Sequence, residues 1–409
     1  MTRGFHPGYR AGRESFEEGW RTMLDKELDL DFPAWPQYDD TERAGLVRAL
    51  EQGQWWRIGG SEVDEFEREF AEANGAPHAL AVTTGTHALE LALQVLGVGP
   101  GTEVVVPAFT FISSSQAAQR LGAVAVPVDV DLDTYCLDPE AVAAAITPRT
   151  AAIMPVHMAG QICDMDALGK LSADSGVPLL HDAAHAHGGR WRDQGVSALG
   201  TMAAFSFQNG KLMTAGEGGA VTFPDSEQYE TAFLRHSCGR PRTDRTYRHQ
   251  TSGSNFRMNE FTASVLRAQL ARLDGQIDTR EQRWPVLAGQ LARITGVLPQ
   301  ATDDRCTRNP HYMAMFRVPG ISEQQRNELV DALVARGLPA FAAFRAIHRT
   351  KAFWETGAPD EPVEAIARRC PNSEALSTDC VWLHHRTLLG TEEQMHAVAE
   401  VVSDALAAS

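Results

Sequence analysis

The sequence lacks the features of a membrane-spanning or disulfide-stabilised protein. No apolar run reaches the ~18–20 residues that a membrane-spanning helix needs, and the stretch from Met1 to Arg21 has no apolar core of the kind found in signal peptides. The six cysteines are scattered and none forms a Cys-x-x-Cys pair. We therefore expect free thiols and a reducing, cytoplasmic location.

Basic residues are also in short supply. There are 37 Lys and Arg against 53 Asp and Glu, which gives a formal net charge of −16. This balance argues against a nucleic-acid or anionic-membrane partner and favours a small-molecule substrate. No Walker loop is present, and Gly97, Gly99 and Gly101 lack the spacing of a dinucleotide-binding fingerprint.

What the sequence does contain, from about residue 78, is an alternation of short apolar runs and helix-length periodic stretches. The runs carry apolar residues at successive positions, as strands do when both faces of a mainly parallel sheet are buried. This order predicts a doubly wound α/β domain. The expected strands are 78–82, 103–106, 123–128, 151–156, 177–180, 202–207 and 219–223, and the expected helices are 86–96, 113–121, 139–145 and 165–175.

A different pattern begins after a long helical stretch at 259–293, inside which Pro285 predicts a kink or break. We expect the aromatic residues before the sheet, at 32–35 and 55–56, to pack on the core or on a partner rather than bind ligand. A strand at 311–318 and helices at 323–335 and 392–408 predict a smaller α+β domain. The expected division is a poorly ordered extension at 1–31, a large domain at 32–285 and a small domain at 286–409.

One lysine stands just past the end of a predicted buried strand, in Phe205-Ser206-Phe207-Gln208-Asn209-Gly210-Lys211. Open α/β sheets bind ligands at the carboxyl edge of their strands. Desolvation at that edge lowers the pKa of a lysine and makes it an imine-forming nucleophile. The alternative is an ordinary exposed lysine in a glycine-rich turn.

A second strand runs directly into an acidic residue in Leu179-Leu180-His181-Asp182-Ala183-Ala184-His185-Ala186-His187. Pyridoxal 5'-phosphate (PLP) chemistry needs a carboxylate to keep the pyridinium nitrogen protonated, and Asp182 is placed for that role. His185 could reach the ring hydroxyl or the imine region. The rival interpretation is a metal-dependent hydrolase with ligands among His181, Asp182, His185 and His187, but it leaves Lys211 without a purpose.

A strand, a Thr/Gly turn and an apolar helix follow one another in Ala81-Val82-Thr83-Thr84-Gly85-Thr86-His87-Ala88-Leu89. The amide N–H groups and the dipole at such a helix start form an anion site, which Gly85 lets a phosphate approach closely. A simple helix cap is the alternative. Ser206 offers a further donor, and Phe109, at the end of another strand, is either a ring-stacking or a core side chain.

Together, Thr-Gly-Thr, Pro-Ala-Phe-Thr-Phe, Asp-Ala-Ala-His, Ser-Phe-x-x-x-Lys, Gly-Glu-Gly-Gly and Gly-Ser-Asn-Phe-Arg-Met-Asn-Glu resemble the DegT/StrS-type sugar aminotransferases of PLP fold type I, from about Gly59 onward. The resemblance implies an obligate homodimer with shared sites. It also implies a Schiff base at Lys211, a pyridinium partner at Asp182, a hydrogen bond from His185 to the ring, stacking by Phe109, and phosphate contacts from Gly85, Thr86, Ser206 and Asn255 of the partner subunit.

Two motifs depart from the sugar aminotransferase pattern. Gln208-Asn209-Gly210 precedes the lysine, where a histidine usually follows Ser-Phe, and His157-Met158-Ala159-Gly160 replaces His-Leu-aromatic-Gly. With segments 32–38, 341–346 and 382–386, they are similar to a branch of the family that dehydrates an aminoshikimate to an aromatic amine. That branch implies a PLP-dependent lyase, leaves a partner oxidoreductase open, and suggests Arg345, His384 and Arg386 as substrate contacts.

Two further hypotheses stay beside this one. The nearer is a transaminase acting on a keto sugar or nucleotide-linked keto sugar, which would use the same lysine and cofactor. The other is a catalytically idle binding subunit, which is disfavoured because every predicted cofactor position carries a competent residue.

Overall fold

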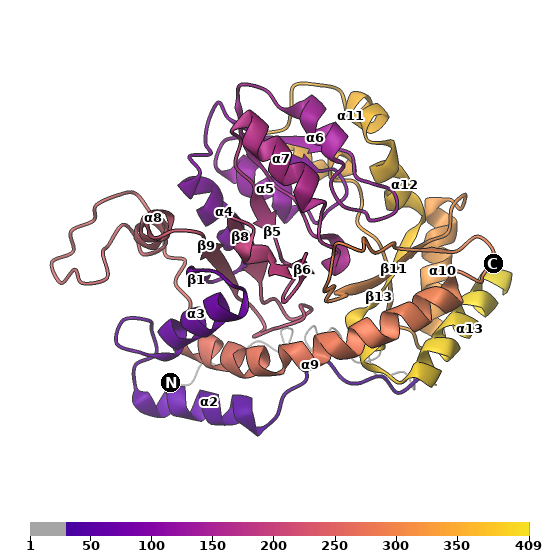
Figure 1. Ribbon diagram of the computed structural model, residues 1–409, viewed down its shortest axis with the longest axis horizontal. Coiled ribbons are helices and arrows are strands. Elements are labelled where there is room, and N and C mark those ends of the chain that lie inside the picture. The colour runs from indigo at the N-terminus through magenta and orange to yellow at the C-terminus, as the bar shows by residue number, and fades with distance from the viewer. Residues whose placement is uncertain (1–29, 409) are drawn as a thin grey trace, which may run out of the picture.

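The computed structural model describes residues 30–408, so the extension predicted for 1–31 lies almost entirely outside the described part. A central sheet dominates the larger half of the molecule (Figure 1). Its strands form a unit in the order β1-β9-β8-β5 and a unit in the order β3-β2-β4. Parallel bridges between Ile153 and Leu179 and between Val156 and Asp182 join the two units. The strands are β1 (His78–Val82), β2 (Glu103–Pro107), β3 (Val124–Val128), β4 (Thr150–Ile153), β5 (Leu180–Asp182), β8 (Met202–Ser206) and β9 (Gly219–Phe223).

Strand directions confirm the predicted fold class. β9 pairs antiparallel with both β1 and β8, whereas the β5–β8, β2–β3 and β2–β4 pairs are parallel. Helices connect the strands, as parallel neighbours require. The connecting helices are α4 (Gly85–Val95), α5 (Ser113–Arg120), α6 (Pro139–Ala145) and α7 (Met165–Ser175), whereas α3 (Glu62–Ala73) precedes β1 and α8 (Ser226–His236) follows β9.

Both faces of the sheet are buried, which explains the unbroken apolar runs. Adjacent residues of one strand belong to different cores: Leu80 and Ala204 lie in one, Ala81 and Phe205 in the other. Side chains alternate across a strand, so each strand must be apolar at every position when helices cover both faces.

The long helix α9 (Glu260–Leu291) passes from the larger half into the C-terminal half (Figure 1). It continues through Pro285 as a single helix, so the predicted break does not occur. Pro285 is exposed, while its neighbours Trp284 and Leu287 are buried in the C-terminal core. Packing on either side of the proline offsets the lost backbone hydrogen bond.

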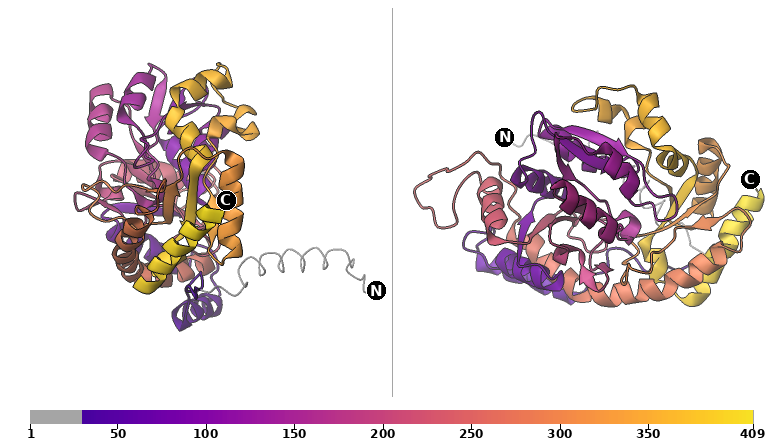
Figure 2. Two further views of the ribbon diagram at one scale, coloured as in Figure 1. Left: turned by 90° about the vertical axis from the view of Figure 1, so that its right-hand side faces the viewer. Right: turned by 45° about the horizontal axis from the view of Figure 1, so that its top comes forward.

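The C-terminal half is built on an antiparallel sheet in the order β10-β11-β13-β12, with helices packed on it (Figure 2). Its core also takes in Leu30 and Phe32 from the start of the described chain. Its elements are β10 (Leu298–Pro299), β11 (Met313–Arg317), α10 (Glu323–Ala335), β12 (Ala340–Ala342), α11 (Val363–Arg369), α12 (Pro371–Asp379), β13 (Cys380–His384) and α13 (Glu392–Ala408). Besides short 3-10 helices, the structure also has α2 (Asp40–Gln52) and a small hairpin of β6 (Arg190–Trp191) and β7 (Gln194–Gly195).

No helix among residues 30–408 combines the length and apolar character that crossing a bilayer requires.

A buried carboxylate ties the two halves together. Asp129, just after β3, accepts hydrogen bonds from the backbone N–H groups of Asn372 (2.9 Å) and Ser373 (2.8 Å) in the first turn of α12. It also accepts one from the Ser373 hydroxyl at 2.7 Å. Asp129 therefore caps a helix more than two hundred residues away in the sequence.

We predict that Asp129→Ala lowers the free energy of unfolding by about 1–3 kcal/mol, because it leaves buried N–H donors without an acceptor. Asp138→Ala is the matched control, since Asp138 caps α6 at an exposed site through a single bond to the Glu140 N–H. Urea unfolding followed by circular dichroism measures both. An equal loss in the two variants would contradict the assigned role.

Candidate active site

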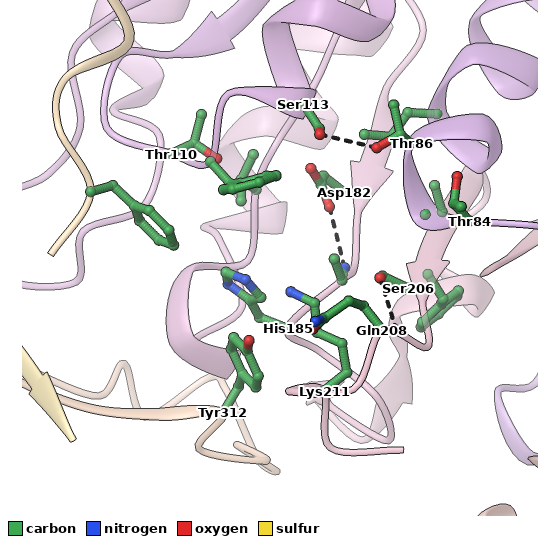
Figure 3. Close-up of a pocket in the computed structure, with 18 of the residues that line it drawn as sticks. Thr84, Thr86, Thr110, Ser113, Asp182, His185, Ser206, Gln208, Lys211 and Tyr312 are labelled. Carbon is green, nitrogen blue, oxygen red and sulfur yellow. Dashed lines mark hydrogen bonds between the residues drawn. The ribbon is translucent and has the colours of Figure 1, made fainter. Parts of the chain in front are cut away.

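The carboxyl ends of β5 and β8 open onto a cavity of about 440 Å³ (Figure 3). This volume lies in the range of small-molecule sites. The cavity is lined by residues from the central sheet and, on one side, from the C-terminal half. Its polar and charged members are Thr84, Thr86, Thr110, Ser113, Asp182, His185, Ser206, Gln208, Lys211, Glu217 and Tyr312.

Lys211 reaches this cavity from a tight turn after β8. Its backbone N–H donates to the carbonyl of Gln208 at 2.8 Å, which closes the turn. Burial of the side chain lowers the pKa of Lys211 to about 8, although the nearby carboxylate of Asp182 opposes that shift. A fraction of the amine is therefore neutral near pH 7, as an imine-forming nucleophile requires.

The lysine turn is held from outside as well. Trp35 Nε1 donates to the carbonyl of Asn209 at 3.0 Å, and His385 Nε2 lies 3.2 Å from the carbonyl of Gly210. Trp35 and His385 also touch edge to face, with ring centroids 4.4 Å apart. Trp35 thus packs on the protein and fixes the position of Lys211 rather than lining the cavity.

Asp182 is the last residue of β5 and is buried. Burial raises its pKa, which is opposed by the Ser114 hydroxyl, donating to Oδ2 at 2.9 Å, and by the Ala184 N–H, donating to Oδ1 at 3.2 Å. Both donors are neutral, so the carboxylate still favours a cation from the ligand. A protonated pyridine nitrogen meets that requirement.

His185 lies beside Lys211 at the edge of the same cavity (Figure 3). Its ring stacks on Tyr312 with centroids 4.3 Å apart. Burial, and then the charge of Lys211, hold the pKa of His185 well below its usual range, so the ring is neutral. Its buried Nδ1 has no partner among the described residues and is free to bond a ligand hydroxyl.

A cradle for an anion lies on the opposite side of the cavity, at the start of α4 (Figure 3). Thr84 caps this helix by accepting the His87 N–H, which leaves the first-turn amides of Gly85 and Thr86 at the helix end. A Cβ on Gly85 would lie 2.6 Å from the Cβ of Ser206. Only glycine fits here, and the space beside it suits a phosphate.

Phe109 is a core residue, which is one of the two alternatives that the sequence left open, and not the stacking side chain that the resemblance implies. Its side chain is fully buried, edge to face with Tyr135 (6.3 Å) and Phe344 (6.0 Å), and it does not line the cavity. Phe111, two residues on, lines the cavity and is 56% exposed. The chain turns after β2, which directs the first aromatic residue into the core and the second toward the ligand.

The other predicted contacts lie away from this chain's cavity. Asn255 is exposed and accepts the Arg257 N–H at 3.4 Å, so its role toward a partner stays a prediction. Arg345 is exposed and pairs with Glu323 at 3.4 Å. His384 and Arg386 do not line the cavity either, and the Arg386 N–H donates to Nδ1 of His384 at 3.2 Å.

The histidines near Asp182 have other partners, which bears on the metal alternative. His181 Nδ1 lies 3.0 Å from Nε2 of His157, and His187 Nε2 lies 2.9 Å from the carbonyl of Ser206. Within residues 30–408, no three His, Cys, Asp or Glu side chains gather to hold a metal ion.

Sequence reasoning missed the aromatic wall of the cavity. Tyr312, Phe344 and Trp382 come from the C-terminal half, and Phe111 completes the wall from the large half. Only the resemblance draws attention to segments 341–346 and 382–386. Nothing local in the sequence indicated that they would meet the lysine.

The nucleophilic lysine, the carboxylate that awaits a cation and the anion cradle fit the amine-reactive carbon, ring nitrogen and phosphate of PLP. The site defines a PLP-dependent enzyme of fold type I. The model of the "DegT/DnrJ/EryC1/StrS aminotransferase family" matches residues 37–402, and the chain belongs to that family.

Individual relatives support the same family assignment. The chain is 73% identical over 379 residues to 3-amino-5-hydroxybenzoate synthase of Amycolatopsis mediterranei, covering 92% of this chain and 98% of that protein. A crystal structure of 3-amino-5-hydroxybenzoic acid synthase superposes with a TM-score of 0.92 at 72% identity, covering 93% of this chain and 100% of that one. The L-glutamine:2-deoxy-scyllo-inosose aminotransferase of Streptomyces fradiae is 34% identical over 92% of this chain and 94% of its own length.

We predict that Gly85→Ala weakens PLP binding at least about tenfold, because the added methyl group intrudes on Ser206 and on the phosphate space. Gly169→Ala is the control, since a Cβ there meets nothing within 4 Å. Absorbance titration of the full-length chain with PLP measures both. Unchanged affinity in Gly85→Ala would reject the cradle.

Proposed function

We propose that this enzyme converts 5-amino-5-deoxy-3-dehydroshikimate to 3-amino-5-hydroxybenzoate, the aromatic starter unit of ansamycin antibiotics. The observation that carries the proposal is the 73% identity to 3-amino-5-hydroxybenzoate synthase along nearly the whole of that protein. A cavity with Phe111, Tyr312, Phe344 and Trp382 on its wall also suits a flat ring. Stacking of aromatic side chains on such a ring is favourable.

Different residues of the site bind the cofactor and transfer the proton. Gly85, Thr86 and Ser206 hold the cofactor phosphate, Asp182 pairs with the ring nitrogen, and His185 bonds the ring hydroxyl. When bound, PLP supplies a protonated ring that withdraws electrons from the amine-bearing carbon of the substrate. Lys211 carries the cofactor and, once free, takes the proton from that carbon with its Nζ. The neighbouring hydroxyl then leaves as water with a proton that Lys211 returns, and tautomerisation gives the aromatic amine.

A transaminase acting on a keto sugar or nucleotide-linked keto sugar is the second candidate. It is favoured by the relatives at 33–38% identity, which are named as aminotransferases or transaminases. The need for a partner oxidoreductase stays a prediction. We also propose a cytoplasmic location, which the six free cysteines support.

We predict that the purified enzyme with PLP and the aminoshikimate substrate produces a new aromatic absorption, and that Lys211→Ala abolishes it. Lys170→Ala, which removes an exposed lysine paired with Asp174 on α7, should leave the rate unchanged. Glutamine alone discriminates the second candidate, because a transaminase accumulates the pyridoxamine form of the cofactor. Accumulation of that form, without aromatic product from the aminoshikimate, would contradict the dehydratase.

We further propose a homodimer in which Asn255 contacts the phosphate bound by the partner subunit. The loop that carries it, between α8 and α9, projects from the body of the molecule (Figure 1). Nearby, an apolar surface is left open on α2 and the segment after it. Clusters of this kind mark protein interfaces. Its exposed members are Leu46, Val47, Leu50, Trp55, Trp56 and Ile58.

Mixing two inactive variants tests the shared site. In a mixed dimer of Lys211→Ala and Asn255→Ala subunits, one of the two sites has both residues intact. Random mixing should therefore restore about a quarter of the parent activity at limiting PLP. If Asn255 acts within its own subunit, or does not contact the phosphate, the mixture gains nothing over the separate variants.

A further inference from the structure

Tyr312 faces Lys211 across the floor of the cavity (Figure 3). The Lys211 Nζ lies 4.5 Å from the centroid of the Tyr312 ring, over its face. Tyr312 directly precedes β11, and its backbone N–H donates to the carbonyl of Ala159 at 2.7 Å. The ring of His185 stacks against the Tyr312 ring.

Few other side chains around Lys211 could interact favourably with its ammonium group. Among the titratable groups around it, Asp182 favours the ammonium form, and Glu217 lines the same cavity. Burial lowers the pKa of His187 to about 3 and holds that of His185 well below its usual range, so both rings are neutral. The ring face of Tyr312 is thus a main contact of the ammonium group.

We propose that Tyr312 is a positioning residue whose ring face holds the Lys211 ammonium group whenever that amine is free. The proposal rests on the role of Lys211 in the proposed function. The negative face of an aromatic ring attracts an ammonium group within about 6 Å, most strongly where water is excluded. After Lys211 has accepted a proton, this contact keeps the amine beside the cavity, ready to return it.

The ring, rather than the hydroxyl group, is responsible. Burial raises the pKa of Tyr312 well above its usual range, so the phenol is neutral over the working pH range and offers no negative charge to the lysine. Phenylalanine at this position keeps the ring face and should preserve the interaction.

The test is the titration of Lys211 in the full-length chain without cofactor, where its amine is free. The chain has four lysines, Lys26, Lys170, Lys211 and Lys351, so labelling lysine with 13C at the ε carbon gives a simple spectrum. In the parent chain the Lys211 resonance should titrate near 8. Tyr312→Leu should lower this midpoint by about one pH unit, because the charged form loses its support. Tyr312→Phe should leave it unchanged.

The direction of the shift separates the proposal from a merely structural role. A smaller side chain that only admitted water would raise the midpoint toward that of an ordinary lysine, and this result, or no change, would overturn the proposal. A fall in Tyr312→Phe as well would transfer the role to the hydroxyl and also overturn it. If the leucine variant misfolds, Tyr312→Met tests the same shift in the Lys211 midpoint. Lys170 and Lys351 serve as internal references.

No substrate is present in this titration. A parent chain that makes no aromatic product but shows the predicted shifts would refute the proposed function and leave the contact between Tyr312 and Lys211 intact.

Discussion

Desolvation at the carboxyl edge of one sheet is the constraint on which the site depends. Removing water makes Lys211 a weaker base and Asp182 a weaker acid, and each change leaves the group needing a partner from the ligand. Lys211 can react with a carbonyl carbon of the ligand, and Asp182 can pair with a cationic group of the ligand. This is possible only because helices and a second, C-terminal sheet cover an edge that would otherwise face solvent.

The sheet and its ligand edge could be predicted because their signals are local. Unbroken apolar runs require burial on two faces, and Asp182 and Lys211 lie a few residues beyond the ends of such runs. The same reasoning allowed a break at Pro285 that does not occur, because the packing of Trp284 and Leu287, which sustains the helix through the proline, is a tertiary contact. Periodicity cannot report such contacts.

The aromatic wall could not be predicted from local signals for a similar reason. Tyr312 and Trp382 are separated from Lys211 by about 100 and 170 residues, and they line the same cavity only because the C-terminal sheet that carries β11 and β13 packs against the large half. Phe109 and Phe111 show that local sequence patterns fail even for two residues that are only two positions apart. Both stand at the end of one strand, and only the turn geometry decides which of them faces the ligand.

Helix α9 has a mechanical consequence. Its 32 residues span about 48 Å, and it contributes Leu266 and Ile277 to one core and Leu287 and Leu291 to another. An unbroken rod anchored at both ends resists hinge bending. The helix therefore opposes closure of the two halves over a ligand.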